Sequence, residues 1–488
     1  MNDSVSSAAS PLYTRLSREQ RRLILLAVAI GTFMAPLDAS VVNIALPKIG
    51  SFFHAPLRLV EWVIMSYLLV ISSLLLTYGR LGDMYGHKKI YVTGFIFFTI
   101  GSLLCGLAPS IMALIFARAF QALGAGMMMA MGPAIVTATS PPQERGRSMS
   151  TIAVAVSVAL TTGPILGGFL TSHFGWRSIF LINLPIGVIA SFLAWRTIPE
   201  TGRKEKQPFD LKGAALFFAA LTSILLSLSY VEKAGWKNPR IWLALTGGLF
   251  LLLLFILLEK KIPAPMLDLS LFKIRLFSLG NLSALLNYIA QYSVVFLMPF
   301  YLQQQRHLDP SHAGLLLIPM PLTTMVIAPI SGILSDKFDV RYLSSAGMGI
   351  TAFGLWQLSR LTVDSPTSAI ILALVTVGLG TGLFQTPNNS AIMGSVPKNR
   401  LGIASSVLAT MRNVGMVTGV AITGAVFSTR YNSLLKTYAA QGIGNSKVLA
   451  FSGAMHTAYL VATCLALLAV FTSLSRGSLN VATGQADS

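Results

Sequence analysis

Charged residues are scarce in this chain of 488 residues. Only 11% of the residues are Asp, Glu, Lys or Arg, and 54% are hydrophobic. An ordinary soluble protein carries about 25% charged residues, and a soluble chain of this length would divide into several domains that each need a polar surface. The composition does not supply those surfaces, so an ordinary soluble fold is excluded.

Residues that bind metals or cross-link chains are also rare. The two cysteines, Cys105 and Cys464, both lie inside apolar segments, and the six histidines are scattered. Structural metal sites and disulfide frameworks need clustered or paired ligands. The sequence therefore predicts no metal site. It also lacks a Gly-x-x-x-x-Gly-Lys-Ser/Thr loop, so we expect neither direct use of ATP nor any other cofactor.

Long apolar segments fill most of the sequence. A transmembrane helix needs about 20 apolar residues, and lipid admits only helices and closed barrels, because backbone polar groups find no water there. Barrel strands would alternate apolar and polar residues, and these segments do not. We predict an all-α polytopic membrane protein with 14 transmembrane helices, near residues 23–47, 59–78, 90–108, 111–138, 149–171, 179–197, 211–230, 240–258, 278–303, 312–334, 343–361, 368–394, 402–428 and 450–474.

The basic residues predict the orientation. With a cytoplasmic N-terminus, about twice as many of the 36 Lys and Arg residues fall in cytoplasmic loops as in outer ones. The positive-inside rule then predicts a multi-pass protein of the inner (cytoplasmic) membrane with both termini in the cytoplasm. The formal charge of +19 lies mostly on a rim that faces anionic lipid. We therefore expect the lipid bilayer as a partner and no nucleic acid.

Two landmarks repeat at nearly the same interval. Asp83 and Asp336 lie in similar loops and are 253 residues apart, and Gly163 and Gly415 are 252 residues apart. A shared interval indicates a duplicated unit of six helices. Parallel halves of this kind are typical of transporters that bind their substrate between the halves. We predict a first six-helix bundle, two inserted transmembrane helices and a second six-helix bundle, over residues 1–200, 201–265 and 266–488.

Four segments resemble motifs of the major facilitator superfamily and of its fourteen-spanner drug:proton antiporter branch. Gly79–Lys89 is similar to the loop signature, Leu37–Pro47 to the first-helix motif, Arg118–Gly126 to the fourth-helix motif and Gly163–Gly168 to the antiporter motif of the fifth helix. The resemblance covers nearly the whole chain. It implies a monomeric transporter, not an enzyme, that works by alternating access and exports drugs in exchange for protons.

The resemblance also implies roles for single residues. It assigns gating to the two loop copies, through Gly79, Asp83, Gly86, Lys88 and Asp336, and close helix packing or antiport to Gly163, Pro164, Gly167 and Gly168. The first loop departs from the family pattern, because Met84 and His87 stand where family members carry basic residues. The electrostatic part of the gating role is therefore the weaker part of this prediction.

Asp38 is the one acidic residue well inside a predicted span. A carboxylate at that depth costs about 2.5–3.5 kcal/mol and normally marks an ion or proton path. We predict that Asp38 carries the proton and pairs with Arg118, which lies at a similar depth in the fourth predicted helix. Glu61, at the outer end of the second helix, is expected to be a solvated rim residue.

Polar and aromatic residues within the predicted spans are the candidates for substrate contact. Methionines at 127–129 and 131 give the fourth helix a pliable apolar surface that suits varied ligands. The candidates are Asn43, Gln121, Tyr288, Gln291, Tyr292, Gln385, Asn388 and Asn389.

These predictions combine into a proton-coupled exporter of amphipathic small molecules, cationic or aromatic, with the proton gradient as its energy source. Three alternatives stay open. The first is a dedicated exporter of one endogenous metabolite, lipid or siderophore, which could work with a periplasmic adaptor. The second is an uptake symporter, which the antiporter motifs disfavour. The third is a membrane-embedded enzyme, which would need paired acids or histidines at the membrane face.

Overall fold

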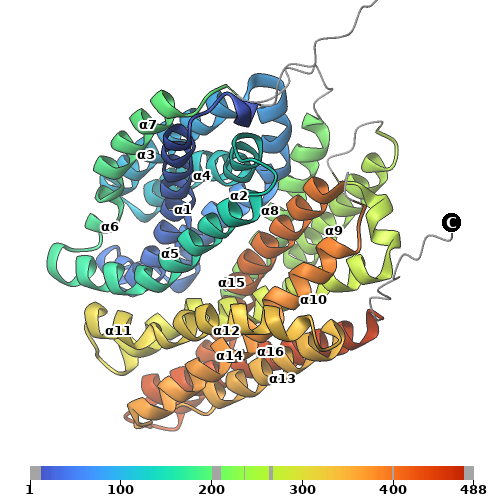
Figure 1. The fold of residues 1–488 in the computed structure, drawn as a ribbon. Helices are drawn as coiled ribbons and strands as arrows, with labels where there is room; N and C mark the ends of the chain where they lie inside the picture. The colour runs from blue at the N-terminus through green and yellow to red at the C-terminus, as the bar shows by residue number, and fades with distance from the viewer. Residues whose placement is uncertain (1–11, 201–209, 236, 263–266, 398–399, 478–488) are drawn as a thin grey trace, which may run out of the picture.

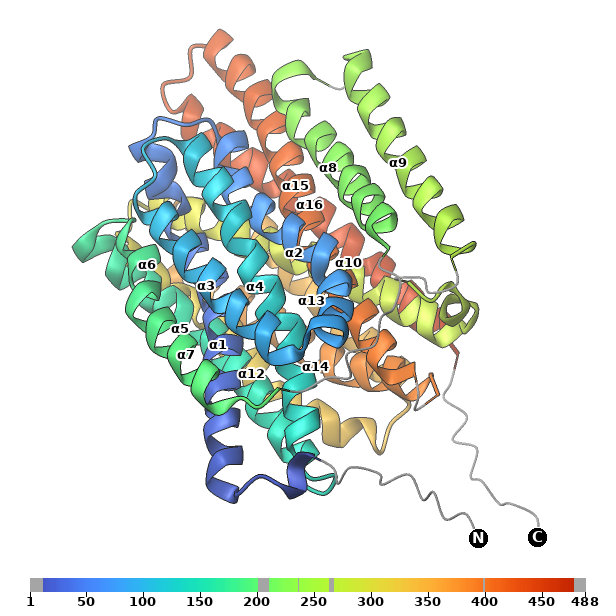
Figure 2. The same cartoon turned by 90° about the horizontal axis from the view of Figure 1, so that it is seen from above.

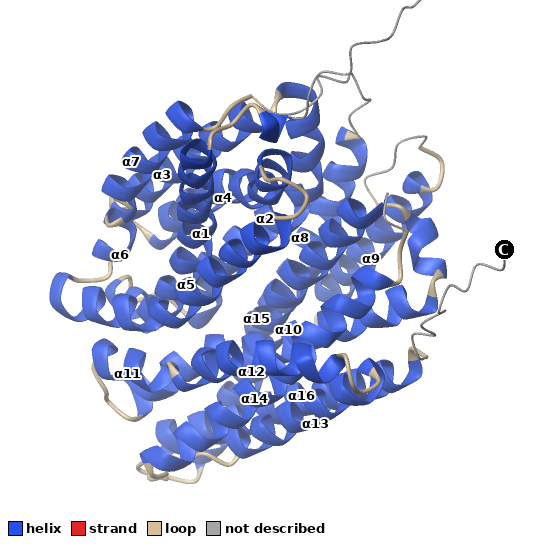
Figure 3. Ribbon diagram, in the orientation of Figure 1, coloured by secondary structure: helices blue, strands red, loops and turns tan. Residues whose placement is uncertain are grey.

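The computed structural model describes residues 12–200, 210–235, 237–262, 267–397 and 400–477, and the regular elements within these ranges are helices (Figure 3). In lipid a helix satisfies its own backbone hydrogen bonds, which is why apolar segments of this length become helical. Twelve helical segments of the described residues are long and apolar enough to cross a membrane. The protein is therefore an all-α membrane protein with many spans.

The first half of the molecule contains seven helices, α1 to α7. They are α1 (Arg18–Phe52), α2 (Leu57–Tyr85), α3 (His87–Gly106), α4 (Ile111–Thr139), α5 (Arg145–Phe174), α6 (Ser178–Leu181) and α7 (Asn183–Thr197), preceded by the short 3-10 turn η1 (Leu12–Thr14). The short α6 and α7 together correspond to the sixth predicted span.

The second half contains α10 to α16. They are α10 (Arg275–Phe300), α11 (Pro310–Leu317), α12 (Pro319–Ser335), α13 (Val340–Ser359), α14 (Thr367–Gly394), α15 (Leu401–Ala440) and α16 (Ser446–Ser475), with the short elements η2 (Leu269–Lys273) and η3 (Tyr301–Gln305). α11 and α12 share the tenth predicted span and meet at Pro319, a residue that suits the start of a helix. α13 and α15, which are not among the twelve segments, are 20 and 40 residues long and pack within this bundle.

Between the halves the chain forms an inserted pair, α8 (Leu211–Ala234) and α9 (Pro239–Glu259). α8 packs on α2 of the first half and on α15 of the second, and α9 packs on α8. The indole N–H of Trp62 on α2 donates to the Ser229 hydroxyl on α8 over 3.0 Å, and Arg58 lies over the Tyr230 ring. The two bundles face each other in Figure 1, and Figure 2 shows the inserted pair along an outer edge.

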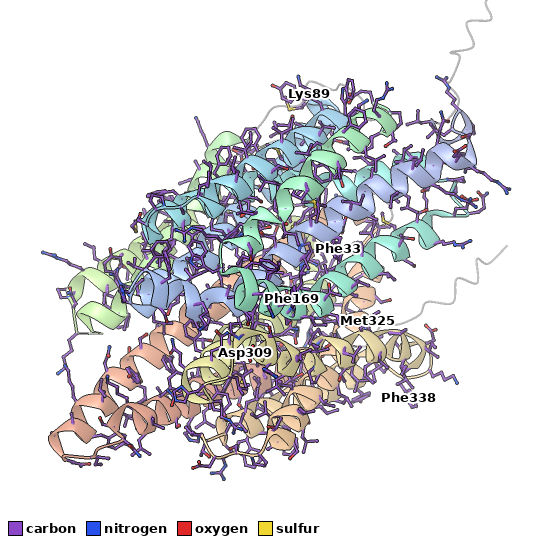
Figure 4. The ribbon with its side chains drawn as sticks, turned by 90° about the vertical axis from the view of Figure 1, so that its left-hand side faces the viewer. Phe33, Lys89, Phe169, Asp309, Met325 and Phe338 are labelled. Atoms are coloured by element: carbon purple, nitrogen blue, oxygen red, sulfur yellow. The ribbon has the colours of Figure 1, made fainter. Side chains whose placement is uncertain are left out.

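The two halves join at one end of the molecule. We call the end where α1 begins the proximal end and the end where α1 finishes, near Phe52, the distal end. Three hydrogen bonds join the halves near the distal end: the Ser172 hydroxyl donates to Asp309 and accepts from the Ser311 N–H, and the Gln303 amide donates to the Ile44 carbonyl. We call this contact the distal seam; Figure 4 shows Phe169 of α5 and Asp309 at this junction.

Two glycines allow the backbones to meet at the distal seam. A Cβ atom on Gly168 of α5 would lie 2.4 Å from the carbonyl oxygen of Pro310. A Cβ on Gly314 of α11 would lie 2.1 Å from the carbonyl oxygen of Pro164. Both distances are far below van der Waals contact with a backbone atom, so any side chain at either position would force the helices apart.

Asp309 gives the distal seam a fixed negative charge. It begins α11 by accepting the Ser311 N–H over 2.9 Å, and it also contacts His312. The hydrogen bond from His312 lowers the pKa of Asp309 to about 2, although partial burial opposes this. Because the pKa of Asp309 is lowered in the folded state, its carboxylate stabilises the folded seam above about pH 4, and this stabilisation is lost as the pH falls toward 2. Asp309 therefore keeps its negative charge near neutrality.

The glycine contacts predict that Gly314→Val opens the distal seam. The reporter is a disulfide between two cysteines introduced as Ser172→Cys and Ser311→Cys. The chain also carries Cys464→Ala, which removes the exposed native cysteine, whereas the buried Cys105 is left in place. We expect ready cross-linking with Gly314 and a several-fold lower yield with valine, because α5 and α11 cannot approach. Gly349→Val is the matched control, since a Cβ there would meet no atom within 4 Å. An unchanged yield with Gly314→Val would contradict the prediction.

Candidate functional site

A buried ion pair lies inside the first half. The Arg118 guanidinium on α4 donates through Nη1 to Oδ2 of Asp38 on α1 over 2.5 Å, and the two side chains are 1% and 0% exposed. The second donor of Arg118, Nε, bonds to the backbone carbonyl of Val63 over 3.2 Å. Burying two charges costs several kcal/mol per ion unless further hydrogen bonds satisfy both partners.

Two amides supply those further hydrogen bonds. The Gln121 amide on α4 and the Asn183 amide on α7 each donate to Oδ1 of Asp38 over 2.9 Å. The Gln121 carbonyl oxygen in turn accepts from Arg118 over 2.6 Å. Both carboxylate oxygens of Asp38 thus face donors, which is the arrangement that an ionised carboxylate needs. We call Asp38, Arg118, Gln121 and Asn183 the carboxylate network.

Close packing and an aromatic ring hold the carboxylate network in place. A Cβ on Gly101 of α3 would lie 2.5 Å from Cα of Gln121, so α3 and α4 touch here, and the Ser102 hydroxyl accepts from Gln121 over 2.8 Å. The Tyr67 ring on α2 lies 4.0 Å from the Arg118 guanidinium carbon. A desolvated cation over a tyrosine face is stabilised by about 2 kcal/mol.

The structure places Asp38 and Arg118 in contact, as the sequence predicted, and their role in proton coupling stays a prediction. Gln121, predicted to contact substrate, is fully buried in the carboxylate network. Asn43 is also buried on α1. Sequence reasoning missed Asn183 and Tyr67. Asn183 carried a signal, since it is a polar residue within an apolar segment.

The prediction for Glu61 is wrong. Its side chain is 1% exposed and lies between α2 and α15, where a Cβ on Gly424 would be 2.0 Å from Oε1 of Glu61. The reason is the length of α15, which continues to Ala440 and covers the outer end of α2. Glu61 is therefore a buried carboxyl group between the two halves.

The antiporter motif packs α5 against both α1 and the second half. A Cβ on Gly163 would lie 2.3 Å from the Ser40 hydroxyl, and one on Gly167 would lie 2.9 Å from the Val41 carbonyl. Both contacts are with α1, within one turn of Asp38. Pro164 and Gly168 meet α11 at the distal seam. One motif thus connects the helix that carries Asp38 to the contact between the halves.

The first loop signature is mostly helical. α2 continues through Gly79 to Tyr85 and α3 starts at His87, so Gly86 alone connects them. Gly86 has φ of 95°, a conformation that favours glycine. The exposed Asp83 contacts His87 Nε2 at 3.2 Å. The predicted loop is therefore a one-residue joint; the gating roles of these residues and of Lys88 stay predictions.

The second copy of the signature is a longer turn. α12 ends at Ser335, the exposed Asp336 follows, and Asp339 begins α13 by accepting the Arg341 N–H over 2.8 Å. Figure 4 marks the two copies by Lys89 on the first bundle and Phe338 on the second. The duplicated sequence thus forms two different turns.

The remaining candidates for substrate contact lie in the second half. On α10, Tyr288 and Tyr292 are 9% and 8% exposed, and Gln291 is half-buried. On α14, Gln385 and Asn389 are also half-buried. These five residues keep some access, and their contact with substrate stays a prediction.

Asn388 differs from its neighbours on α14. It is fully buried, its amide donates to the Gly280 carbonyl over 3.1 Å, and its oxygen accepts from Arg476 over 2.7 Å. Arg476 also donates to the Ser344 hydroxyl over 2.9 Å, and burial lowers its pKa to about 10, so it remains charged near neutrality. The contacts of Asn388 join α10, α14 and α16.

Sequence reasoning also missed Arg412. It is a half-buried basic residue in the first third of α15, and it interacts with Tyr288 and Tyr292 of α10. The signal was present in the sequence, since Arg412 and Arg118 are basic residues within predicted spans. The described residues contain no group of three or more His, Cys, Asp or Glu side chains that could hold a metal ion.

Comparison with known proteins agrees with this architecture. The chain is 39% identical over 423 residues to "Riboflavin transporter RibZ" of Clostridioides difficile, covering 86% of this chain and 91% of that protein. It is 33% identical over 422 residues to "Multidrug resistance protein Stp" of Mycobacterium tuberculosis, covering 85% of this chain and 78% of that protein.

A solved structure shares the fold. The crystal structure of a bacterial homologue of the human lysosomal transporter Spinster, in an inward-facing and unoccupied conformation, superimposes with a TM-score of 0.68 at 17% identity, covering 94% of this chain and 99% of that one. The model of the Major Facilitator Superfamily matches residues 28–420 and 280–479. The chain is a membrane transporter that belongs to the Major Facilitator Superfamily.

Proposed function

We propose that this transporter exports amphipathic aromatic compounds from the cytoplasm in exchange for protons. The observation that carries the proposal is the carboxylate network, in which a buried acid pairs with a buried arginine on a helix that packs on α5 near the distal seam. A relative named as a multidrug resistance protein supports export of drug-like compounds. Within the superfamily, we place the chain in the fourteen-spanner drug:proton antiporter branch.

The geometry suggests how proton binding and shape could be linked. All hydrogen-bonding partners of Asp38 in the carboxylate network are donors, so a proton on Asp38 would displace one of them. We infer that the arrangement with a closed distal seam is the one in which Asp38 has released its proton. Proton binding would weaken the hold of α4 and α7 on α1, and α1 carries this change to the distal seam through Gly163 and Gly167. The proton gradient would then drive the alternation.

We propose fourteen spans, although twelve segments meet the length and hydropathy conditions. α13 packs along α14 and α16, and α15 packs along α10 and α16. The helices α10, α14 and α16 all belong to segments that are long and apolar enough to span a membrane. A helix packed along such helices crosses the same bilayer. Both termini then lie at the proximal end, which we place in the cytoplasm from the distribution of basic residues.

A second candidate is a carrier dedicated to one metabolite. The relative at 39% identity is named as a riboflavin transporter, which favours this reading over an exporter of lipids or siderophores. Uptake of labelled riboflavin by proteoliposomes, with and without a pH gradient, distinguishes the candidates. Saturable transport of riboflavin that unrelated aromatic dyes do not inhibit would favour the dedicated carrier.

We predict that Asp38→Asn abolishes export driven by a pH gradient. The amide cannot accept a proton, and it presents a donor either to Arg118 or to the amides of Gln121 and Asn183. Arg118 also loses its counter-ion, so we expect the variant to be destabilised by about 3–5 kcal/mol. The measurements are export of a dye from proteoliposomes and thermal unfolding of the purified protein.

Two further variants control this experiment. Glu144→Gln removes an exposed acid and should leave export unchanged. The double variant Asp38→Asn with Arg118→Gln removes both charges and should recover thermal stability without recovering export. The proposal of proton coupling would be abandoned if Asp38→Asn still exported dye under a pH gradient.

We also predict that Asp83→Asn slows transport and leaves equilibrium binding nearly unchanged. Asp83 is exposed beside the Gly86 joint, away from the carboxylate network, so it would affect conformational exchange and not the ligand site. Initial rates in proteoliposomes and dye affinity in detergent measure the two effects separately. A large loss of affinity would show that Asp83 is part of the binding site.

A further inference from the structure

Arg412 is an unexplained charge inside the second half. It lies in the first third of α15 and inside the predicted span 402–428, where an arginine costs about as much as the carboxylate of Asp38. Arg118 in the first half has Asp38 as its counter-ion, whereas the described residues give Arg412 tyrosines and no carboxylate partner. A charge that is costly to insert and has no structural counter-ion usually serves a ligand.

The packing of α15 on α10 determines where Arg412 lies. A Cβ on Gly415 would be 2.8 Å from Cβ of Tyr288, and one on Gly419 would be 3.1 Å from Cβ of Tyr292. These glycines are four residues apart, so one face of α15 lies directly on α10 at the two tyrosines. Arg412 precedes Gly415 by three residues and therefore shares that face, beside Tyr288.

The tyrosines extend from Arg412 toward the first half. Tyr292 lies within electrostatic range of Tyr67 of α2, whose ring covers the guanidinium of Arg118 and whose hydroxyl donates to the Ala35 carbonyl. Arg412 and Arg118 thus lie on either side of two tyrosines, Tyr292 of α10 and Tyr67 of α2. A ligand at Arg412 would lie on the side of α10 that faces the first half.

We propose that Arg412, Tyr288 and Tyr292 form the subsite that binds the negatively charged group of an aromatic substrate. A guanidinium binds carboxylate, sulfonate or phosphate through paired hydrogen bonds, and tyrosine adds a hydroxyl donor and an aromatic face. Asp38 is already engaged by Arg118, whereas Arg412 has no carboxylate partner among the described residues, so the charge offered at this subsite is positive. The inference rests on the proposed function and narrows the substrate, expected from the sequence to be cationic or aromatic, to an anionic aromatic compound.

An anionic substrate changes the electrical balance of exchange. When one proton enters and one monovalent anion leaves, two positive charges move inward in each cycle. A monovalent cation exchanged for one proton would move no net charge. Export of the anion is therefore driven by the membrane potential as well as by the pH gradient, and export of the cation by the pH gradient alone.

The experiment uses two dyes with the same xanthene ring system, fluorescein as the anion and rhodamine 123 as the cation. Binding is measured by fluorescence polarisation with the full-length protein in detergent, and export is measured in proteoliposomes with the pH gradient and a potassium diffusion potential imposed separately. The variants are Arg412→Gln, Arg412→Lys and, as the matched control, Arg430→Gln, which removes an exposed arginine from the same helix.

We expect Arg412→Gln to weaken fluorescein binding about tenfold or more, because the substitution removes a hydrogen bond from a charged donor. Rhodamine 123 binding should be unchanged or stronger, which also shows that the variant is folded. Arg412→Lys should recover part of the fluorescein affinity, and Arg430→Gln should behave as the unmodified protein does. Fluorescein export should respond to an imposed potential.

Three results would overturn the inference: no fluorescein binding by the unmodified protein, unchanged fluorescein affinity in Arg412→Gln, or an equal loss of both dyes that lysine does not reverse. Failure of the proposed function looks different. In that case fluorescein still binds through Arg412 in detergent, and neither dye is exported under a pH gradient.

Discussion

The burial of the Asp38 carboxylate is the interaction on which the rest of the structure depends. A charge in a low-dielectric interior is tolerated only when its lone pairs are satisfied, and Asp38 obtains its donors from α4 and α7. The helices of the first half are therefore held together around one buried carboxyl group. A buried polar network that is only partly satisfied is costly. A change in the hydrogen bonds of Asp38 therefore requires the surrounding helices to move.

The glycines of α5 determine which helices a movement of α1 would reach. Gly163 and Gly167 hold α5 on α1, while Gly168 and Pro164 hold it on α11. A helix that contacts both partners through its backbone cannot absorb a shift by rotating flexible side chains. A displacement of α1 would therefore press directly on α5 and, through α5, on α11 of the second half. Asp309 at the distal seam keeps its negative charge near neutrality, because its pKa is lowered.

The sequence predicted the helical class, the approximate positions of the helices and the Asp38–Arg118 pair, because lipid and buried charge both leave strong local patterns. It could not predict the surroundings of Glu61 or Asn388, which depend on how far α15 extends and on where α16 ends. We expected similar loops at the two copies of the loop signature, but their backbones differ: the first is the single residue Gly86, and the second is the turn at 336–339. Asn183 and Arg412 acquired meaning only when distant helices came together. Long-range packing, and not local composition, decides these cases.

The inserted helices make the two sides of the transporter unequal. α8 packs on both α2 and α15, and Trp62 and Arg58 of α2 contact Ser229 and Tyr230 of α8. α8 covers the contact between α2 and α15 from the surrounding acyl chains. Neither inserted helix packs on α5 or α12 among the described contacts. Along α2 and α15 the two halves are therefore separated from the lipid by an added helix pair, whereas along α5 and α12 they have no such cover.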